Sequence, residues 1–186
     1  CNFYRIFANQ ILQNKKIMNE VVIDEQKVIK AAGEGMDEFI KVFTDAYYEK
    51  LGGTLTAENL QLLNASQITL VAYDILRSEV MDGGFVQLIH NGYGAFFFLN
   101  PFAKAMRLWG LKDLQDLIYD ARKLYDKYHH EIEKECSEEE FMAMFEKYEE
   151  FDDLDDRFVE HEEEYTNSIA IYVDQNIDTF AKIEKN

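Results

Sequence analysis

Proline and glycine are scarce in this chain of 186 residues, which contains one proline and nine glycines. An all-β protein needs many turn residues and protected edges, so this scarcity argues against a sandwich or a barrel. Hydrophobic residues make up 47% of the chain and aromatic residues 14%, which is enough to fill a core and excludes disorder along the whole chain. The composition therefore predicts a folded, helix-rich protein.

Cysteine is also scarce. Cys1 and Cys136 lie far apart, with no CxxC or Cys/His spacing, so the sequence indicates neither a disulfide framework nor a zinc site. No apolar run approaches the length of a membrane span, and the Phe96–Leu99 cluster is an example of the short runs present. We expect a reducing, cytoplasmic location. Two interpretations of the start stay open: Cys1 is the lipidated first residue of an anchored lipoprotein, or Met18 is the true start.

Basic residues are few, and their deficit is concentrated at one end. Residues 1–130 hold 16 acids and 14 bases, whereas residues 131–186 hold 20 acids and five bases. The negative electrostatic field of residues 131–186 repels nucleic acid and anionic membranes, and it speeds association with basic surfaces. Direct binding to DNA or RNA is therefore disfavoured, and a basic protein surface is the expected partner.

Apolar residues recur at helical spacing along most of the chain. The segments predicted to be helical are Met36–Leu51, Thr56–Leu63, Ser66–Val80, Phe85–Asn91, Pro101–Trp109, Leu111–Tyr128, 138–163 with a break at Asp152, and 165–183. Val21, Val22 and Ile23 indicate a short extended piece. We predict an all-α, single-domain multi-helix bundle over residues 36–186, with short connections and an acidic C-terminal region. Residues 1–35 form an N-terminal extension for which no fold is predicted.

Three helix starts carry recognisable signals. Ser66 is the predicted N-cap of its helix, and Asn100 with Pro101 reads as an N-cap followed by the first helical position. Ser137 with Glu140 three residues later matches a capping box.

The acidic segment has a predicted inside and outside. Its apolar seam consists of Phe141, Met144, Tyr148, Phe151, Leu154, Phe158 and Tyr165. A helical wheel places the outward acids opposite this seam or on its shoulder, and they are the candidate partner-binding residues: Glu139, Glu146, Glu149, Glu150, Asp153, Asp156, Glu160, Glu163 and Glu164. If residues 131–164 formed one helix, they would carry roughly one net charge per 3.6 Å, close to the phosphate spacing along one DNA strand. A solvated face that confers solubility is the alternative interpretation.

No catalytic or metal-binding motif is recognisable in the sequence. His129 and His130 adjoin Glu131, but no HExxH or paired Glu-x-x-His pattern occurs. The run from Asp152 to Asp156 lacks the glycine and distal glutamate of a calcium loop, and reads instead as a capped first turn of a helix. Acids surround Cys136, which opposes formation of a thiolate. We therefore expect no enzyme activity, no cofactor and no metal.

The stretch from Glu79 to Asn91 is the most distinctive polar segment. Gln87 and Asn91 share a helical face, and Gly83 with Gly84 permits a tight turn that brings Glu79 near them. Two interpretations stay open: a polar pocket for a ligand, or a hydrogen-bonded network that fixes this corner.

Together with the Phe151, Leu154, Asp155 and Phe158 segment, the pattern Glu79, Gly83, Gly84, Phe85, Gln87 and Asn91 resembles the bacterial DNA-mimic protein (DMP) nineteen family. The resemblance covers roughly residues 65 to 180. It implies an all-helical fold and an acidic protein that imitates duplex DNA, occupying the DNA-binding face of a helix-turn-helix transcription factor, often as a homodimer. The motif residues look architectural, and the outward acids belong to no motif that can be aligned.

The leading hypothesis is an acidic, DNA-mimic-like regulator that binds the basic face of a transcription factor or another nucleic-acid-binding protein. An immunity or antitoxin-like inhibitor of a basic toxin is the second hypothesis, because it requires the same charge. A small-ligand-binding helical protein centred on Glu79, Gln87 and Asn91 is the third.

Overall fold

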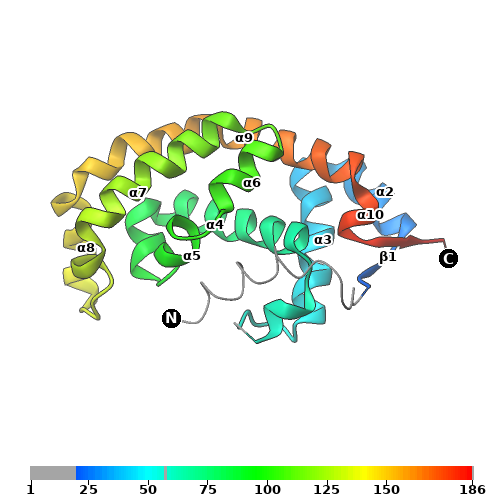
Figure 1. Cartoon of the computed structure of the whole chain (residues 1–186), viewed down its shortest axis with the longest axis horizontal. Helices are drawn as coiled ribbons and strands as arrows, with labels where there is room; N and C mark the ends of the chain where they lie inside the picture. Colours follow the sequence, from blue (N-terminus) through cyan, green and yellow to red (C-terminus); the bar gives the residue numbers. More distant parts are fainter. Residues whose placement is uncertain (1–19, 57, 186) are drawn as a thin grey trace. The chain divides into compact units, whose positions relative to one another are not determined.

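Helices dominate the computed structural model, which describes residues 20–56 and 58–185 (Figure 1). Nine α-helices, two short 3-10 helices and two three-residue strands make up the regular structure of these residues. The predicted all-α fold class is therefore confirmed. The described residues form two compact units: one runs up to Asp74 and resumes at Glu164, and the other is Ile75–Glu163. The division predicted from the sequence, an N-terminal extension over residues 1–35 and a single domain over residues 36–186, stays a prediction.

The first unit brings together the two ends of the described chain. Its elements are β1 (Val22–Asp24), α2 (Glu25–Glu34), α3 (Met36–Lys50), the 3-10 helix η1 (Asn59–Leu62), the first part of α4 (Ala65–His90), the last part of α9 (Asp152–Gln175), α10 (Ile177–Phe180) and β2 (Lys182–Glu184). β1 pairs with β2 in parallel, with Val22 opposite Lys182 (Figure 1). The extended piece predicted near Val21 is thus confirmed, whereas β2 lies where a helix to residue 183 was predicted.

The core of the first unit combines aliphatic and aromatic side chains. The rings of Phe39 and Phe43 meet edge to face at 5.2 Å, and Tyr47 is fully buried. The Tyr47 hydroxyl donates to the Phe180 carbonyl at 3.0 Å, and the Gln67 amide donates to the same carbonyl at 2.8 Å. Two helices thereby hold the C-terminal segment in place, because a buried carbonyl must find donors.

The cap of α4 differs from the prediction. Asn64, rather than Ser66, is the N-cap: its side-chain oxygen accepts the Gln67 N–H at 2.9 Å, and the Gln67 side chain accepts the Asn64 N–H at 2.9 Å. This reciprocal pair is a capping box with amide side chains. The Asn64–Gln67 pair satisfies two backbone N–H donors, whereas a serine cap at Ser66 would satisfy only one. The helix therefore starts before Ser66.

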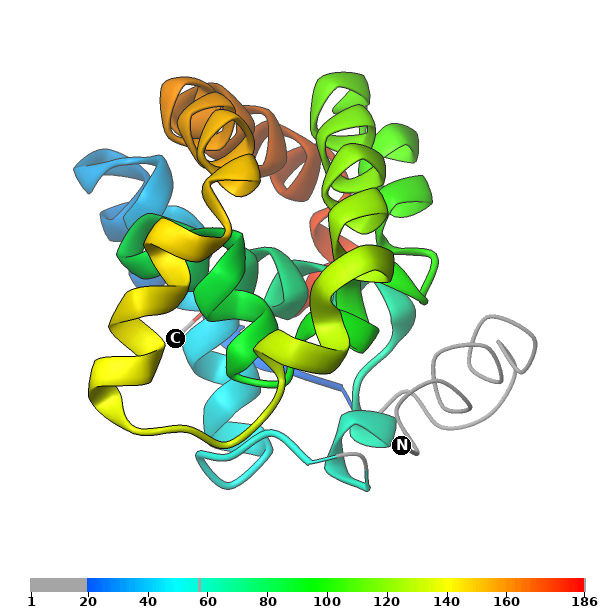
Figure 2. The same ribbon diagram turned by 90° about the vertical axis from the view of Figure 1, so that its left-hand side faces the viewer.

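The second unit consists of helices, the longest complete one being α7. It contains the remainder of α4, α5 (Gly94–Phe98), α6 (Phe102–Leu108), α7 (Lys112–Ile132), α8 (Glu138–Lys147), the 3-10 helix η2 (Glu149–Phe151) and the first part of α9. Figure 2 shows the loop that joins α7 to α8. The predicted capping box of Ser137 and Glu140 at the start of α8 is confirmed.

The start of α6 is shifted by one residue. Pro101 takes the N-cap position rather than the first helical position. The Asn100 side chain does not cap α6, because its amide donates to the Phe96 carbonyl at the end of α5 instead.

The two final helices do not divide near residue 164 as predicted. α9 is continuous from Asp152 to Gln175, while the break before it falls at Tyr148–Phe151. The seam explains the continuity, since Phe158, Tyr165 and Ile169 are all buried at helical spacing and no glycine or proline lies within α9. The break predicted at Asp152 is confirmed at the boundary between η2 and α9.

The backbone of α4 leaves the helical conformation at the two adjacent glycines, as predicted for a tight turn. Gly83 has φ −151° and Gly84 has φ +69°, and the second value lies in the left-handed region that favours glycine. A Cβ built on Gly84 would clash with a carboxylate oxygen of Asp155. Glycine is therefore required at this position both by the backbone angle and by the packing of α9.

Gly84→Ala should destabilise the protein by about 3–5 kcal/mol, since it strains the backbone and displaces a hydrogen-bonded carboxylate. The matched control is Gly92→Ala, where φ is +83° but nothing lies within 4 Å of the added Cβ. That variant should lose only about 1–2 kcal/mol from backbone strain. Urea denaturation followed by circular dichroism measures both values, and equal losses would contradict a role for the contact with α9.

Candidate functional site

The predicted inside and outside of the acidic segment are both present in the structure. Met144, Tyr148, Phe151, Leu154, Phe158 and Tyr165 of the seam are buried, and Phe141 is half-buried. All nine nominated acids are exposed: Glu139, Glu146, Glu149, Glu150, Asp153, Asp156, Glu160, Glu163 and Glu164. Their role in binding a partner stays a prediction.

Bases of α7 and α8 neutralise part of the acidic surface. Lys127 and the Tyr128 hydroxyl both donate to Glu150, at 3.0 and 2.8 Å, and these bonds lower the pKa of Glu150. Lys147 and the Tyr148 hydroxyl bind Glu131 in the same way, at 2.6 and 3.0 Å. The charge of Glu150, one of the nominated acids, is therefore offset by an ion pair with Lys127.

Four nominated acids form a row on α9 that we call the α9 acidic stripe: Asp153, Asp156, Glu160 and Glu163. They recur at intervals of three and four residues, so they share one helical face, and none of the four side chains makes a hydrogen bond or ion pair with another described residue. Ten residues separate the first from the last, a rise of about 15 Å. Residues 131–164 do not form one helix, since α7 ends at Ile132 and η2 separates α8 from α9, so the charge spacing calculated for a single helix does not apply.

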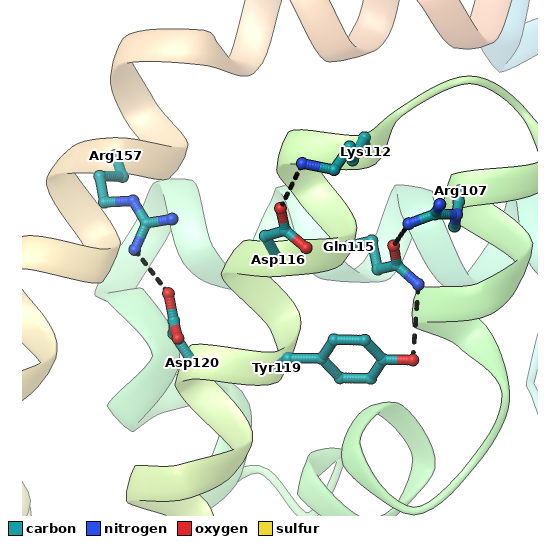
Figure 3. A network of polar contacts seen from close by, with 7 residues as sticks. All are labelled: Arg107, Lys112, Gln115, Asp116, Tyr119, Asp120 and Arg157. Carbon is teal, nitrogen blue, oxygen red and sulfur yellow. Dashed lines mark hydrogen bonds and ion pairs between the residues drawn. The ribbon is translucent and has the colours of Figure 1, made fainter.

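The single base on this part of α9 turns away from the stripe. Arg157 lies four residues after Asp153, a spacing that permits an ion pair on a helix. Its guanidinium instead contacts Asp120 of α7 at 3.0 Å (Figure 3). Together with Lys123, Arg157 lowers the pKa of Asp120. The stripe therefore keeps its full negative charge.

Asp155 points inward, unlike the acids around it. Its carboxylate accepts the Phe85 N–H at 2.8 Å and lies against Gly84. Burial raises the pKa of Asp155 from its ordinary value of 3.8 to about 7, and the nearby charges of Asp152 and Asp156 act in the same direction. This contact fixes the rotation of α9 and so sets which of its acids face outward.

The polar corner forms the network that its spacing predicts. Glu79 accepts from the Gln87 amide at 3.2 Å and from the Asn91 amide at 2.8 Å, and the Gln87 amide also donates to Asp82 at 2.8 Å. Gly83 lies directly against the Gln87 side chain. Burial and the Glu79 charge raise the pKa of the neighbouring Tyr93.

The network is partly exposed, since Glu79 and Gln87 are half-buried and Asn91 is exposed. A small cavity of the second unit lies elsewhere, among residues of α5, α6 and α7. Both interpretations of the corner, a ligand pocket and a network that fixes the turn, stay predictions.

Comparison with known proteins decides the family. Residues 61–176 match the family described as DMP19-like protein. The chain belongs to the DMP19-like protein family. It is 34% identical over 127 residues to a protein named DNA mimic protein DMP19 from Neisseria meningitidis serogroup B (strain ATCC BAA-335 / MC58), an alignment that covers 68% of this chain and 77% of that protein. The family resemblance noted in the sequence is confirmed.

The segment matched to the DMP19-like family contains both the polar corner and the α9 acidic stripe. Within residues 20–56 and 58–185, no three histidine, cysteine, aspartate or glutamate side chains are grouped so that they could hold a metal ion. In the same residues no helix is both long and apolar enough to cross a membrane.

Two inward-facing acids of this DMP19-like chain were missing from the candidate list. Besides Asp155, Glu162 is only 6% exposed, and its carboxylate accepts a hydrogen bond from Arg77 of α4. Each lies four residues after a seam phenylalanine, Phe151 or Phe158, so a helical wheel places both on the buried face. The spacing signal was present, but a carboxylate is rarely buried without a specific partner.

Asp155→Asn should change how stability depends on pH. The folded protein binds the Asp155 proton more tightly than the unfolded chain, so the contribution of Asp155 to wild-type stability is lost as the pH rises from 3.8 to about 7. Asparagine keeps an acceptor for the Phe85 N–H and removes the ionisation. The difference in unfolding free energy, variant minus wild type, should therefore grow by on the order of 2–4 kcal/mol between pH 4 and pH 7.5.

Urea denaturation at several pH values measures this difference. Asp153→Asn is the control, because that neighbour is exposed and its loss should leave the pH dependence nearly unchanged. Parallel pH profiles for wild type and Asp155→Asn would contradict burial as the cause.

Proposed function

We propose that this protein binds the basic DNA-binding face of a DNA-binding protein and thereby competes with DNA. The observation that carries the proposal is the α9 acidic stripe, four exposed carboxylates of Asp153, Asp156, Glu160 and Glu163 without a basic partner in the described chain. Membership of the DMP19-like family supports the same function, because the relative from Neisseria meningitidis is named a DNA mimic protein.

The dimensions of the stripe fit this role. Four charges over about 15 Å of helix are spaced about 5 Å apart, somewhat wider than the 3.4 Å per phosphate along one strand of B-DNA. The exposed acids Glu139, Glu146 and Glu149 of α8 and η2 add charge to the same unit. A basic surface that accommodates a phosphate row can therefore meet a comparable row of carboxylates.

Electrostatic free energy favours complex formation. Like charges that face one another without counter-charges destabilise the compact state, and a partner rich in lysine and arginine relieves that repulsion. A helix-turn-helix protein is the expected class of partner, since its recognition helix is basic and exposed. Formation of a homodimer stays a prediction of the family resemblance, and light scattering on the purified protein measures it.

The test begins with capture of a partner from the native lysate at low salt, followed by its identification. We expect a DNA-binding protein, and the present chain should displace it from its DNA. Raising the salt from 50 to 500 mM should weaken the complex at least tenfold, because exposed charges are screened. A captured toxin or nuclease whose catalysis is blocked would instead establish the antitoxin-like alternative.

A charge-matched pair of variants tests the location of the interface. The first neutralises the stripe: Asp153→Asn, Asp156→Asn, Glu160→Gln and Glu163→Gln. The second removes the same charge from exposed acids of α2 and α3: Glu34→Gln, Glu38→Gln, Asp45→Asn and Glu49→Gln. The stripe variant should lose about ten- to a hundredfold in affinity for the partner, and the control less than threefold. Equal losses would contradict the proposed site.

A further inference from the structure

The acids of the second unit are strongly segregated along the chain. Residues 83–112 contain no aspartate or glutamate but include Lys104, Arg107 and Lys112, whereas residues 113–163 contain 20 acids and six bases. The first stretch covers the end of α4, all of α5 and α6, and the first residue of α7. One part of this acidic unit therefore carries positive charge.

A small cavity lies at this basic part of the unit, among α5, α6 and α7. Its volume is about 260 Å³. Four of its lining side chains are almost fully buried and form an apolar floor: Phe97, Phe98, Ala103 and Ile118. Leu99 and Tyr119 also line it, and each remains more than a third exposed. The cavity therefore offers apolar surface that solvent can reach.

Two cations and no acid line the same cavity. Lys104 makes no hydrogen bond or ion pair with any other described residue. The Arg122 guanidinium lies 3.8 Å from Asp126 and is 47% exposed, so that contact is a weak surface pair. Both cations are therefore available to an incoming anion.

One wall of the cavity is held in place before any ligand arrives. The Tyr119 hydroxyl accepts from the Gln115 amide at 3.5 Å, and the oxygen of that amide accepts from Arg107 of α6 at 3.1 Å (Figure 3). Because these two hydrogen bonds connect α7 to α6, the Tyr119 ring needs little ordering when a ligand binds. A preformed wall lowers the entropic cost of association.

We propose that this cavity binds a small organic anion, a carboxylate on an aromatic or short aliphatic body. The apolar floor favours a hydrocarbon body, and the ammonium of Lys104 with the guanidinium of Arg122 favours the carboxylate. The volume lies just below the roughly 300–1,000 Å³ of pockets for drug-sized ligands, so the ligand is of single-ring size. Its lining residues are distinct from the α9 acidic stripe, and the proposal stands apart from the proposed function.

The experiment is a titration of ¹⁵N-labelled full-length protein with benzoate, followed by two-dimensional NMR. Benzamide is the matched neutral probe, since it has the same ring and nearly the same shape. Benzoate should shift the amide signals of residues 97–100, 102–104 and 118–122, and benzamide should bind at least fivefold more weakly. The idea is overturned if benzoate causes no localised shifts, or if the two probes bind equally well.

Variants identify the cations. Lys104→Gln and Arg122→Gln should each weaken benzoate binding about five- to tenfold, the loss of one charge-assisted hydrogen bond. Lys134→Gln, an exposed lysine of the same unit outside the cavity, should change it less than twofold. An equal loss in Lys134→Gln would show general charge attraction and overturn the site. The dispersion of each spectrum reports whether the variant is folded.

Discussion

The Asp155 carboxylate accepts the N–H of Phe85 where α4 turns at Gly84, and the arrangement of the second unit depends on this contact. The first N–H groups of a helical segment have no partner within it, so another part of the chain must satisfy them. Here a carboxyl oxygen of Asp155 on α9 accepts one of them. Leu154 and Phe158 flank Asp155 in the sequence, and both are buried. The polar contact and the apolar seam therefore fix the same rotation of α9.

That rotation decides which acids face solvent. With Asp155 and Glu162 turned inward, Asp153 and Asp156 are exposed, and Arg157 reaches Asp120 of α7. Arg157, the base on this part of α9, is thus directed away from the stripe, while lysines of α7 and α8 offset Glu150 and Glu131. Repulsion among the remaining carboxylates lowers stability, and a basic partner or added salt reduces it.

Local sequence signals predicted much of the fold. Three features depend on residues close in sequence and were predicted from spacing and residue type: the helical periodicity of α7, the capping box of Ser137 and the turn at Gly83–Gly84. The errors have non-local or competing causes. β2 forms because it pairs with β1 from the other end of the described chain. α9 continues past residue 164 because side chains beyond that point are still buried at helical spacing.

For the acidic segment, the sequence by itself determined the excess of negative charge, the helical seam and the exposure of one face, because composition and helical periodicity are local properties. Only the tertiary structure decided that Asp155 accepts a backbone N–H and that Glu162 meets Arg77. Burial of a carboxylate depends on a partner from a distant helix, which no local pattern specifies. The same holds for Arg157, whose choice of Asp120 over Asp153 leaves the α9 acidic stripe charged.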